Sequence, residues 1–371
     1  MVYQEGKGMI FLAVSCMTFS FLISFLLCRY LLANADKFRK GRRVYSERIK
    51  LHTKGVPRLG GIAIYGAFFI TLLYFYLIKK IHFQDYNIKL LGILLASTSI
   101  MAVGLYDDLV KRLSYKIKFA SQILAVIIVI ILGYNVEIIT NPLGGNIHIG
   151  VSGILFVLLW ILAITNAMNL IDGLDGLACG ISAIVGLSFF IVALHQDNIF
   201  CMLVAASIIG ANLAFLKYNF YPARLFLGDS GSLFLGFILS ILAIESYTKR
   251  ATVVSMVVPL LTLFIPVSSV VFTFSRRIAS AKNPFKPDRM HLHYRFLRAG
   301  VSHRDTVLIY LSATLIYTTL GTFCFFMPKR FELAIIAFAA LTMLCLYMWA
   351  LHFLKLKKGD GPKGDTLEHK M

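Results

Sequence analysis

The stretch from Val151 to Ala178 reads VSGILFVLLWILAITNAMNLIDGLDGLA, a long apolar segment with a polar end. Residues 151 to 171 contain no Asp, Glu, Lys or Arg. An apolar segment of about 20 residues is long enough to cross the hydrocarbon core of a bilayer as a helix. The two Asp-Gly steps that follow are typical of a helix end and a turn. The stretch therefore predicts a membrane-spanning helix that holds polar side chains at one face of the membrane.

Apolar segments of similar length recur along the whole chain. The 371 residues are 58% hydrophobic and 15% charged, with a mean hydropathy of +0.78, whereas a typical soluble domain is about 25% charged. The sequence predicts an all-α polytopic membrane protein that forms a single domain over residues 1–371. We expect about 10 or 11 transmembrane helices. Their approximate extents are 8–32, 59–79, 90–106, 118–135, 152–170, 177–194, 199–217, 231–247, 251–275, 307–327 and 331–354.

The formal net charge of +19 bears on orientation and partners. In a soluble protein this excess would suggest nucleic acid, but here it fits positively charged cytoplasmic loops and anionic lipid headgroups. Lys and Arg are most frequent in the loops that face the cytoplasm if the N-terminus is outside. We therefore expect an external N-terminus, a cytoplasmic C-terminus and no nucleic-acid partner. The external segment 136–151 has alternating stretches around Asn-Pro and Gly-Gly, which predict a short β-hairpin.

Five of the 18 acidic residues fall in three short loops that share the predicted cytoplasmic face. These loops carry Asp107 and Asp108, Asp172 and Asp175, and Asp229. Carboxylates at the ends of membrane helices are costly and indicate function. Carboxylates that converge beside Lys and Arg predict a divalent cation and a polyanionic ligand. Solvated helix-end acids remain the alternative for the Asp107–Asp108 pair, and a capping turn remains the alternative for Asp229.

The polar end of the fifth predicted helix is the most specific stretch. Asn166, Asn169 and Asp172 recur every three residues, which places them on one helical face. Asp175 follows in the turn that ends the helix. A calcium loop of the EF-hand kind would need more oxygen ligands and a terminal Glu. We expect these four residues to bind substrate.

A glycine-containing loop precedes the second predicted helix. Lys54 comes shortly before Gly60 and Gly61. Glycines allow the backbone to approach a phosphate, and the start of a helix favours an anion. Tight helix packing at the two glycines is the alternative explanation.

The largest predicted cytoplasmic loop runs from Arg276 to about Arg304. It contains Arg289 and the run His291-Leu-His293-Tyr294. A His-x-His pair is able to bind a metal, but no third soft ligand lies near. We interpret the two histidines as contacts to a diphosphate or a sugar, with a solvated basic loop as the alternative.

These motifs, in this order, resemble those of the polyprenyl-phosphate N-acetylhexosamine-1-phosphate transferase family, glycosyltransferase family 4. The resemblance covers roughly residues 45–300 and rests mainly on Asn-x-x-Asn-x-x-Asp-Gly-x-Asp-Gly at 166–176 and Gly-Asp-x-Gly-Ser at 228–232. It implies a multi-pass protein of the bacterial inner membrane, with a cytoplasmic active site that needs Mg²⁺. It also implies transfer of HexNAc-1-phosphate from a UDP-sugar to undecaprenyl phosphate, with release of UMP. The implied partners are these two substrates and membrane lipids, and a homodimer is compatible.

The run His291-Leu-His293-Tyr294 bears on the sugar donor. The peptidoglycan-precursor branch of the family needs three successive histidines, which are absent here. The run is closer to the branch that uses UDP-GlcNAc and starts O-antigen, enterobacterial common antigen or teichoic acid linkage synthesis. That branch usually has His in place of Tyr294, and an Asp soon after the proline where this chain has Ser268 and Ser269. The resemblance therefore implies GlcNAc-1-phosphate as the transferred group and leaves another HexNAc open.

The implied reaction is a phosphoryl transfer, in which positioning and charge neutralisation dominate. We expect Asp229 to bind Mg²⁺, assisted by Asp108 or the Asp172–Asp175 turn. Asp107 is the usual candidate for a general base, but a phosphate with a second pKa of about 6 is already mostly ionised at neutral pH. We therefore expect Asp107 to orient the lipid phosphate. The expected site comprises Asp107, Asp108, Asp229 and His291 as catalytic residues, Asp229 and Asp108 as metal ligands, and Lys54, Lys118, Asn166, Asn169, Asp172, Asp175, Arg289 and His293 as substrate-binding residues.

Two other classes of protein share some of these features. A transporter of anionic substrates would also hold polar loops among membrane helices. Transporters usually place their charges near the bilayer midplane and in repeated halves, whereas here the acids lie at one face and no repeat is found. A CDP-alcohol phosphatidyltransferase would carry an Asp-Gly-x-x-Ala-Arg run, which is absent. The sequence therefore favours a transferase.

Overall fold

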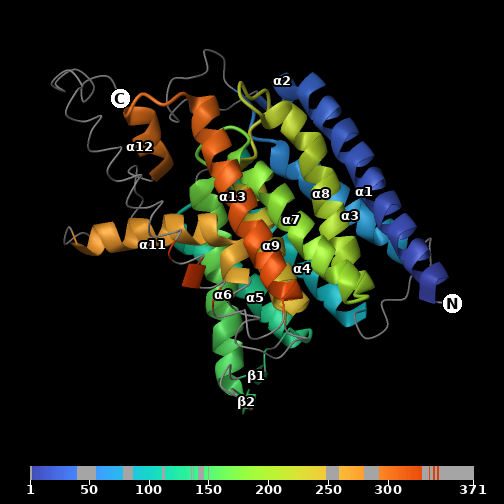
Figure 1. Cartoon of the computed structure of the whole chain (residues 1–371). Coiled ribbons are helices and arrows are strands. Elements are labelled where there is room, and N and C mark those ends of the chain that lie inside the picture. Colours follow the sequence, from blue (N-terminus) through green and yellow to red (C-terminus); the bar gives the residue numbers. More distant parts are fainter. Residues whose placement is uncertain are drawn as a thin grey trace.

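Helices make up nearly all of the chain that the computed structural model describes (Figure 1). The structure describes residues 2–39, 56–77, 87–110, 113–134, 136, 138–140, 146–148, 150–247, 259–279, 292–327, 334, 337–338 and 341. The helices are α1 (Val2–Ala33), α2 (Ala35–Arg39), α3 (Gly60–Leu77), α4 (Asn87–Leu109), α5 (Tyr115–Ile131), α6 (Val151–Ile171), α7 (Leu177–His195), α8 (Ile199–Asn219), α9 (Gly228–Tyr247), α11 (Phe264–Ala279), α12 (Leu292–Arg298) and α13 (His303–Phe326). This content confirms the predicted helical class.

Eight helices in the described residues are long and apolar enough to cross a membrane. They are α1, α3, α4, α6, α7, α8, α9 and α13, and each overlaps one of the predicted spans. The fourth predicted span corresponds to α5, which has only 17 residues. The ninth corresponds to α11, whose apolar part is limited to Phe264–Phe274. The eleventh, 331–354, falls almost wholly outside the described residues.

Helix α9 lies at the centre of the bundle and carries Asp229 in its first turn. It packs against α3, α4, α6, α7 and α8. Over its membrane-spanning window, 94% of the residues are buried. The side chains of Phe234 and Phe237 are completely inside. A helix enclosed on all sides holds its first turn in a fixed place among its neighbours.

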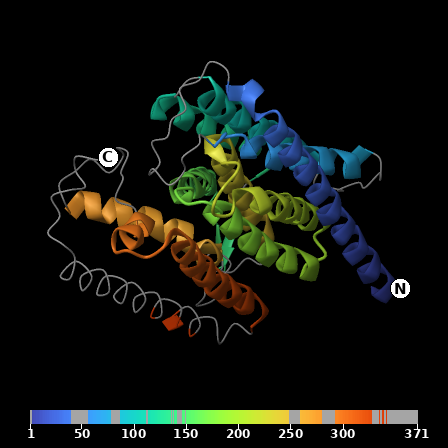
Figure 2. The same ribbon diagram turned by 90° about the horizontal axis from the view of Figure 1, so that it is seen from above.

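Helix α1 packs on α8 through small and hydroxyl side chains. The thiol of Cys16 and the hydroxyls of Ser20 and Ser24 donate hydrogen bonds to carbonyl oxygens of α8. The three donors are spaced four residues apart, so they lie on one face of α1. Small residues allow membrane helices to approach closely, and hydrogen bonds across the contact add to the packing. Seen from above, α1 and α11 lie at opposite sides of the bundle (Figure 2).

Two short strands, β1 (Ile138–Thr140) and β2 (Asn146–His148), pair antiparallel with Ile139 opposite Ile147. They fall in the segment for which the sequence predicts a hairpin. They lie at one end of the bundle, away from α2 and α12 (Figure 1). The external position of this end stays a prediction.

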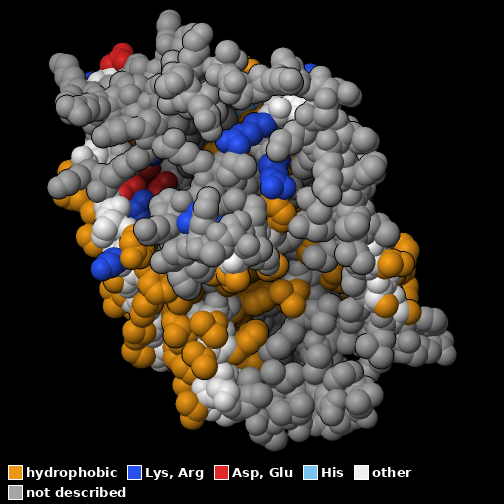
Figure 3. All heavy atoms as spheres, turned by 90° about the vertical axis from the view of Figure 1, so that its left-hand side faces the viewer, with side chains coloured by type: hydrophobic (Ala, Val, Ile, Leu, Met, Phe, Trp, Pro, Cys, Tyr) orange, Lys and Arg blue, Asp and Glu red, His pale blue; other side chains and the backbone are white. Residues whose placement is uncertain are grey.

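One face of the molecule shows a broad band of hydrophobic side chains, with the charged side chains mainly to one side of it (Figure 3). Exposed apolar residues of α4 and α5 include Leu91, Leu95, Leu124 and Ile127. Apolar surface of this kind suits contact with lipid chains, whereas charged groups stay near the membrane boundary. The band therefore agrees with a membrane setting.

Candidate functional site

Three carboxylates from two helix ends meet at one end of the bundle. Asp107 and Asp108 lie in the last turn of α4, and Asp229 lies in the first turn of α9. One carboxylate oxygen from each residue lies within 4.8 Å of the others. Because α4 and α9 run antiparallel, the end of one meets the start of the other. The predicted convergence of the first and third acidic loops is confirmed.

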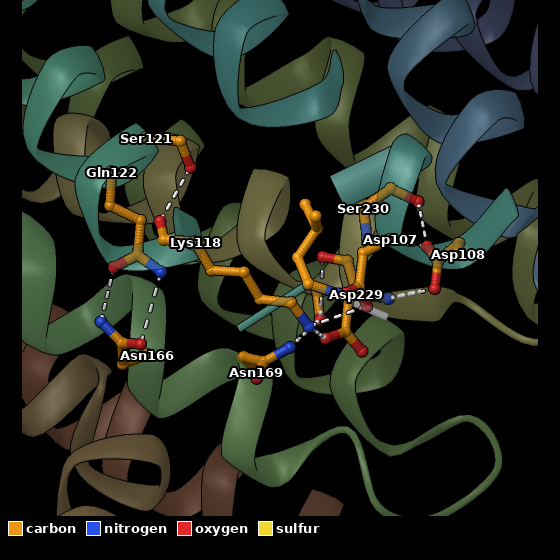
Figure 4. Close-up of polar contacts among 11 residues, drawn as sticks. Asp107, Asp108, Lys118, Ser121, Gln122, Asn166, Asn169, Asp229 and Ser230 are labelled. Atoms are coloured by element: carbon orange, nitrogen blue, oxygen red, sulfur yellow. Dashed lines mark hydrogen bonds and ion pairs between the residues drawn. The ribbon is translucent and has the colours of Figure 1, made fainter. Parts of the chain in front are cut away.

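Lys118 of α5 joins two of these carboxylates (Figure 4). Its Nζ lies 2.7 Å from Oδ2 of Asp107 and 2.5 Å from Oδ2 of Asp229. The Asp107 side chain is 3% exposed and that of Asp229 is 17% exposed. Asp107 also accepts a hydrogen bond from the backbone N–H of Leu113. The ammonium thus fixes two carboxylates that would otherwise repel each other.

Asp108 turns towards the start of α9 and away from Lys118 (Figure 4). Its Oδ1 accepts from the backbone N–H of Asp229 at 3.1 Å. Its Oδ2 accepts from the backbone N–H of Ser230 at 2.9 Å and from the Ser230 hydroxyl at 2.7 Å. Two adjacent acids in the sequence therefore have different environments.

The two asparagines of the central motif contact two different helices (Figure 4). Asn166 donates to the side-chain oxygen of Gln122 on α5 at 2.6 Å. Asn169 donates to the Ser232 hydroxyl on α9 at 2.8 Å, one turn along from Asp229. The motif on α6 is therefore tied to the helices that carry Lys118 and Asp229.

The turn that follows α6 is held by hydrogen bonds between backbone N–H groups and side chains. Gly176 has a φ of 80° at the start of α7, a value that favours glycine. The carboxylate of Asp175 accepts from the N–H of Ala223 at 3.1 Å, and the N–H of Asp175 donates to Nε2 of His303 at 3.0 Å. Asp172 and Asp175 are 6% and 8% exposed. The contacts of Asp175 join this turn to the segment after α8 and to the start of α13.

The histidine-containing segment packs directly on the same turn. His293 lies on α12 with 1% of its surface exposed. A Cβ atom at Gly173 would collide with Nε2 of His293 and lie 3.1 Å from the Tyr294 hydroxyl. Gly173 is therefore the residue that allows this close approach. In the structure His293 packs against the turn at Gly173, and its expected contact with substrate stays a prediction.

The two glycines that begin α3 serve packing. The N–H groups of Gly60 and Gly61 donate to the carbonyls of Phe226 and Leu227, both at 2.9 Å. A Cβ at Gly61 would collide with the hydroxyl of Ser230. The structure thus favours the packing alternative for these two glycines over a phosphate cradle.

Lys54, Arg289 and His291 lie outside the described residues, so their expected roles stay predictions. Sequence reasoning missed two residues that the structure brings to the site, Gln122 and His303, whereas Ser230 and Ser232 stood in the 228–232 motif, for which a capping turn was the alternative. Gln122 is a polar residue inside an apolar helix, which is itself a sign of function or of a buried polar contact. His303 gave no signal of its own, because a histidine at a helix start is common.

The sequence matches known proteins over most of its length. The model of the family described as glycosyl transferase family 4 matches residues 90–247. A Bacillus subtilis protein named probable undecaprenyl-phosphate N-acetylglucosaminyl 1-phosphate transferase is 37% identical over 262 residues, which are 70% of this chain and 71% of that protein. The Thermotoga maritima undecaprenyl-phosphate alpha-N-acetylglucosaminyl 1-phosphate transferase is 34% identical over 304 residues, 81% of this chain and 87% of that protein. A Bacillus mycoides phospho-N-acetylmuramoyl-pentapeptide-transferase is 30% identical over 324 residues, 82% of this chain and 95% of that protein.

Proposed function

The chain belongs to glycosyl transferase family 4 as a polyprenyl-phosphate HexNAc-1-phosphate transferase, and we propose that it transfers GlcNAc-1-phosphate from UDP-GlcNAc to undecaprenyl phosphate and releases UMP. Of the relatives named above, two are named as N-acetylglucosaminyl 1-phosphate transferases and one as a phospho-N-acetylmuramoyl-pentapeptide-transferase. The absence of three successive histidines supports the GlcNAc donor. The reaction would be the first membrane step of a cell-envelope polysaccharide pathway.

The observation that carries this proposal is the meeting of Asp107, Lys118 and Asp229 at one end of the bundle. The reaction moves a phosphoryl group between two anionic substrates, so it needs positive charge and fixed geometry more than covalent chemistry. The carboxylates held by Lys118 supply the fixed geometry, and a divalent cation bound by them would supply the positive charge.

The donor atoms of this site fit a magnesium ion. Hard cations such as Mg²⁺ prefer carboxylate oxygens and are often bound by one or two carboxylates together with substrate phosphates. We propose Asp229 as the ligand, because it is the most exposed of the carboxylates joined by Lys118. Bound Mg²⁺ would neutralise charge on the diphosphate of the donor.

The remaining roles follow from the contacts of the side chains. Lys118 holds Asp107 and Asp229 in place and lies close enough to both to neutralise phosphate charge beside them. Asp107 is 3% exposed, which suits orientation of the lipid phosphate and leaves little room for a large movement. Asn169 and Asp172 would hold the nucleotide from the end of α6. His293 would support the turn that contains Gly173 by packing against it.

The site would face the cytoplasm of a bacterial inner membrane. Ser114 lies near the acid cluster, and Asn146 lies on β2 at the other end. We expect a cysteine at Asn146, but not one at Ser114 or Ser302, to react with a membrane-impermeant thiol reagent in intact cells. The five cysteines in the described residues are buried, and Cys345 would be replaced by serine to keep the background low. Labelling at Ser114 from outside would contradict a cytoplasmic site.

A donor screen tests the reaction itself. Purified protein would be supplied with undecaprenyl phosphate, Mg²⁺ and one of UDP-GlcNAc, UDP-GalNAc or UDP-MurNAc-pentapeptide, and UMP would be measured. We expect the fastest release with UDP-GlcNAc. Comparable release with the pentapeptide donor would refute the branch assignment, and no release with any donor would refute the proposed function.

A further inference from the structure

Asp108 and Asp107 are adjacent, but their carboxylates are bonded to different parts of the molecule. The donors to Asp108 all belong to the first turn of α9: the N–H of Asp229, the N–H of Ser230 and the Ser230 hydroxyl, at 3.1, 2.9 and 2.7 Å. The donors to Asp107 are the ammonium of Lys118 and the N–H of Leu113. Asp107 therefore belongs to the ion cluster, and Asp108 belongs to the start of a helix.

The start of α9 needs such an acceptor. The first N–H groups of a helix have no partner within the helix, and in an apolar environment each unsatisfied group is costly. A capping side chain usually comes from the residue just before the helix. Here Leu227 precedes α9 and Gly228 begins it, and neither has a side-chain acceptor. Asp108 supplies the acceptor from α4 instead.

Gly228 makes room for this contact. Its φ of 79° favours glycine. A Cβ at this position would also lie 2.5 Å from Oδ2 of Asp108. The backbone before α9 is therefore shaped so that the carboxylate reaches the free N–H groups. A negative charge at a helix N-terminus is favourable in addition to its hydrogen bonds.

We propose that Asp108 is a positioning residue that caps α9 from α4 and fixes the backbone of Asp229, and that it is not itself a metal ligand. The inference rests on the proposed function for the role of Asp229. A carboxylate offers about four acceptor positions, and three donors from α9 already occupy Asp108. Because the N–H of Asp229 is one of these donors, loss of the Asp108 carboxylate displaces the residue that we propose as the ligand.

Hydrogen exchange of the full-length protein without metal tests the capping role. The variants are Asp108→Asn, which keeps one of the two acceptor oxygens that Asp108 uses, and Asp108→Ala, which keeps neither. In peptides that cover residues 228–234, we expect amide exchange to rise by about tenfold in the alanine variant and by less than about threefold in the asparagine variant. Unchanged exchange in both variants would overturn the proposal.

Turnover separates positioning from metal binding. Positioning predicts that kcat falls about tenfold or more in Asp108→Ala and falls less in Asp108→Asn, which keeps one acceptor oxygen, with a similar Mg²⁺ requirement in both. Metal binding predicts that both variants lose as much activity as Asp229→Asn and need more Mg²⁺. If the alanine variant does not fold, Asp108→Asn decides alone: substantial activity supports capping, and a loss as deep as that of Asp229→Asn refutes it.

The two proposals fail separately. Hydrogen exchange needs no turnover, so unchanged exchange would refute the role of Asp108 while transfer by the unaltered protein still stood. Conversely, a protein that transfers no sugar phosphate would refute the proposed function, and the exchange result would still report whether Asp108 caps α9.

Discussion

Helices α4 and α9 run antiparallel and carry charged contacts at both ends, but the two ends differ in charge balance. At one end, Lys89 forms an ion pair with Glu245, whose side chain is 5% exposed. At the other end, the carboxylates of Asp107, Asp108 and Asp229 gather near the ammonium of Lys118. The residues named here are those of the described ranges.

The difference separates a structural contact from a functional one. An ammonium and a carboxylate that face each other from two helices, as Lys89 and Glu245 do, stabilise the contact between those helices. Three carboxylates within 4.8 Å of one another repel, and the low dielectric of a membrane protein strengthens the repulsion. Capping of α9 accounts for Asp108, but folding gives no reason to place Asp107 and Asp229 beside it. The end with Asp107, Asp108 and Asp229, here called the crowded end, is therefore the candidate site. The end with Lys89 and Glu245, here called the balanced end, has a structural role.

The largest effect is expected from Asp229→Asn at the crowded end. Loss of the proposed ligand should lower Mg²⁺-dependent turnover by at least about 100-fold, because a bound metal contributes several kcal/mol to catalysis. The thermal unfolding temperature should stay close to that of the unaltered protein. UMP release by purified protein is the measurement. Asp197→Asn is the matched control, since this exposed carboxylate lies in the α7–α8 turn, and near-normal turnover in Asp229→Asn would contradict the assignment.

Lys89→Met tests the balanced end. It leaves the buried carboxylate of Glu245 without its ammonium, which should reduce the free energy of unfolding by about 3 kcal/mol. Turnover by the folded fraction should not change, because the pair lies at the end opposite the site. Thermal unfolding and UMP release would be measured together.

A double variant, Lys89→Met with Glu245→Gln, is the control for this pair. It removes both charges, so much of the lost stability should return. Lys118→Met is the matching change at the crowded end. If Lys89→Met and Lys118→Met lowered turnover of the folded protein equally, the two ends would not differ in function and the comparison would fail.

Gly173→Ala tests whether the α12 segment must pack on the turn that follows α6. The added methyl group would collide with His293 and approach the Tyr294 hydroxyl. Overpacking of this kind should lower kcat/KM by about tenfold. Gly8→Ala is the control, because a Cβ there meets nothing within 4 Å. Full activity in Gly173→Ala would show that this packing does not matter to the reaction.

The smallest effect is expected from Tyr294→His, which restores the residue usual in the UDP-GlcNAc branch. The variant should retain transfer and shift the ratio of kcat/KM between UDP-GlcNAc and UDP-GalNAc by about threefold. Competition between the two donors measures this ratio. No shift would mean that Tyr294 only packs beside Gly173.

Much of the fold and part of the site were predictable from the sequence. Long apolar segments and Asp-Gly steps are local signals, so eight predicted spans and the turn after α6 were found. The meeting of Asp107 with Asp229 followed from their loops lying at the same membrane face. A helix that crosses a membrane has one end at each face. Once the spans are located, the sequence therefore tells which loops lie at the same face.

The pairing of side chains across helices was not predictable. Asn166 was expected to bind substrate, but nothing in the sequence indicates that Gln122 lies opposite it. The pair of Lys89 and Glu245 was missed, since the two residues are far apart in the chain and each looks like an ordinary helix-end charge. Asp108 was expected to bind metal, and its contacts with the start of α9 became visible only when both helices were in place.

The most direct test of the central claim is a Mn²⁺ titration of the purified protein, followed by electron paramagnetic resonance. Mn²⁺ stands in for Mg²⁺ because it accepts the same oxygen ligands. Three proteins would be compared: the unaltered chain, Asp229→Asn at the crowded end and Glu245→Gln at the balanced end. The account predicts that Asp229→Asn weakens Mn²⁺ binding by at least about tenfold, while Glu245→Gln leaves it unchanged. Binding that survives in Asp229→Asn and disappears in Glu245→Gln would contradict it.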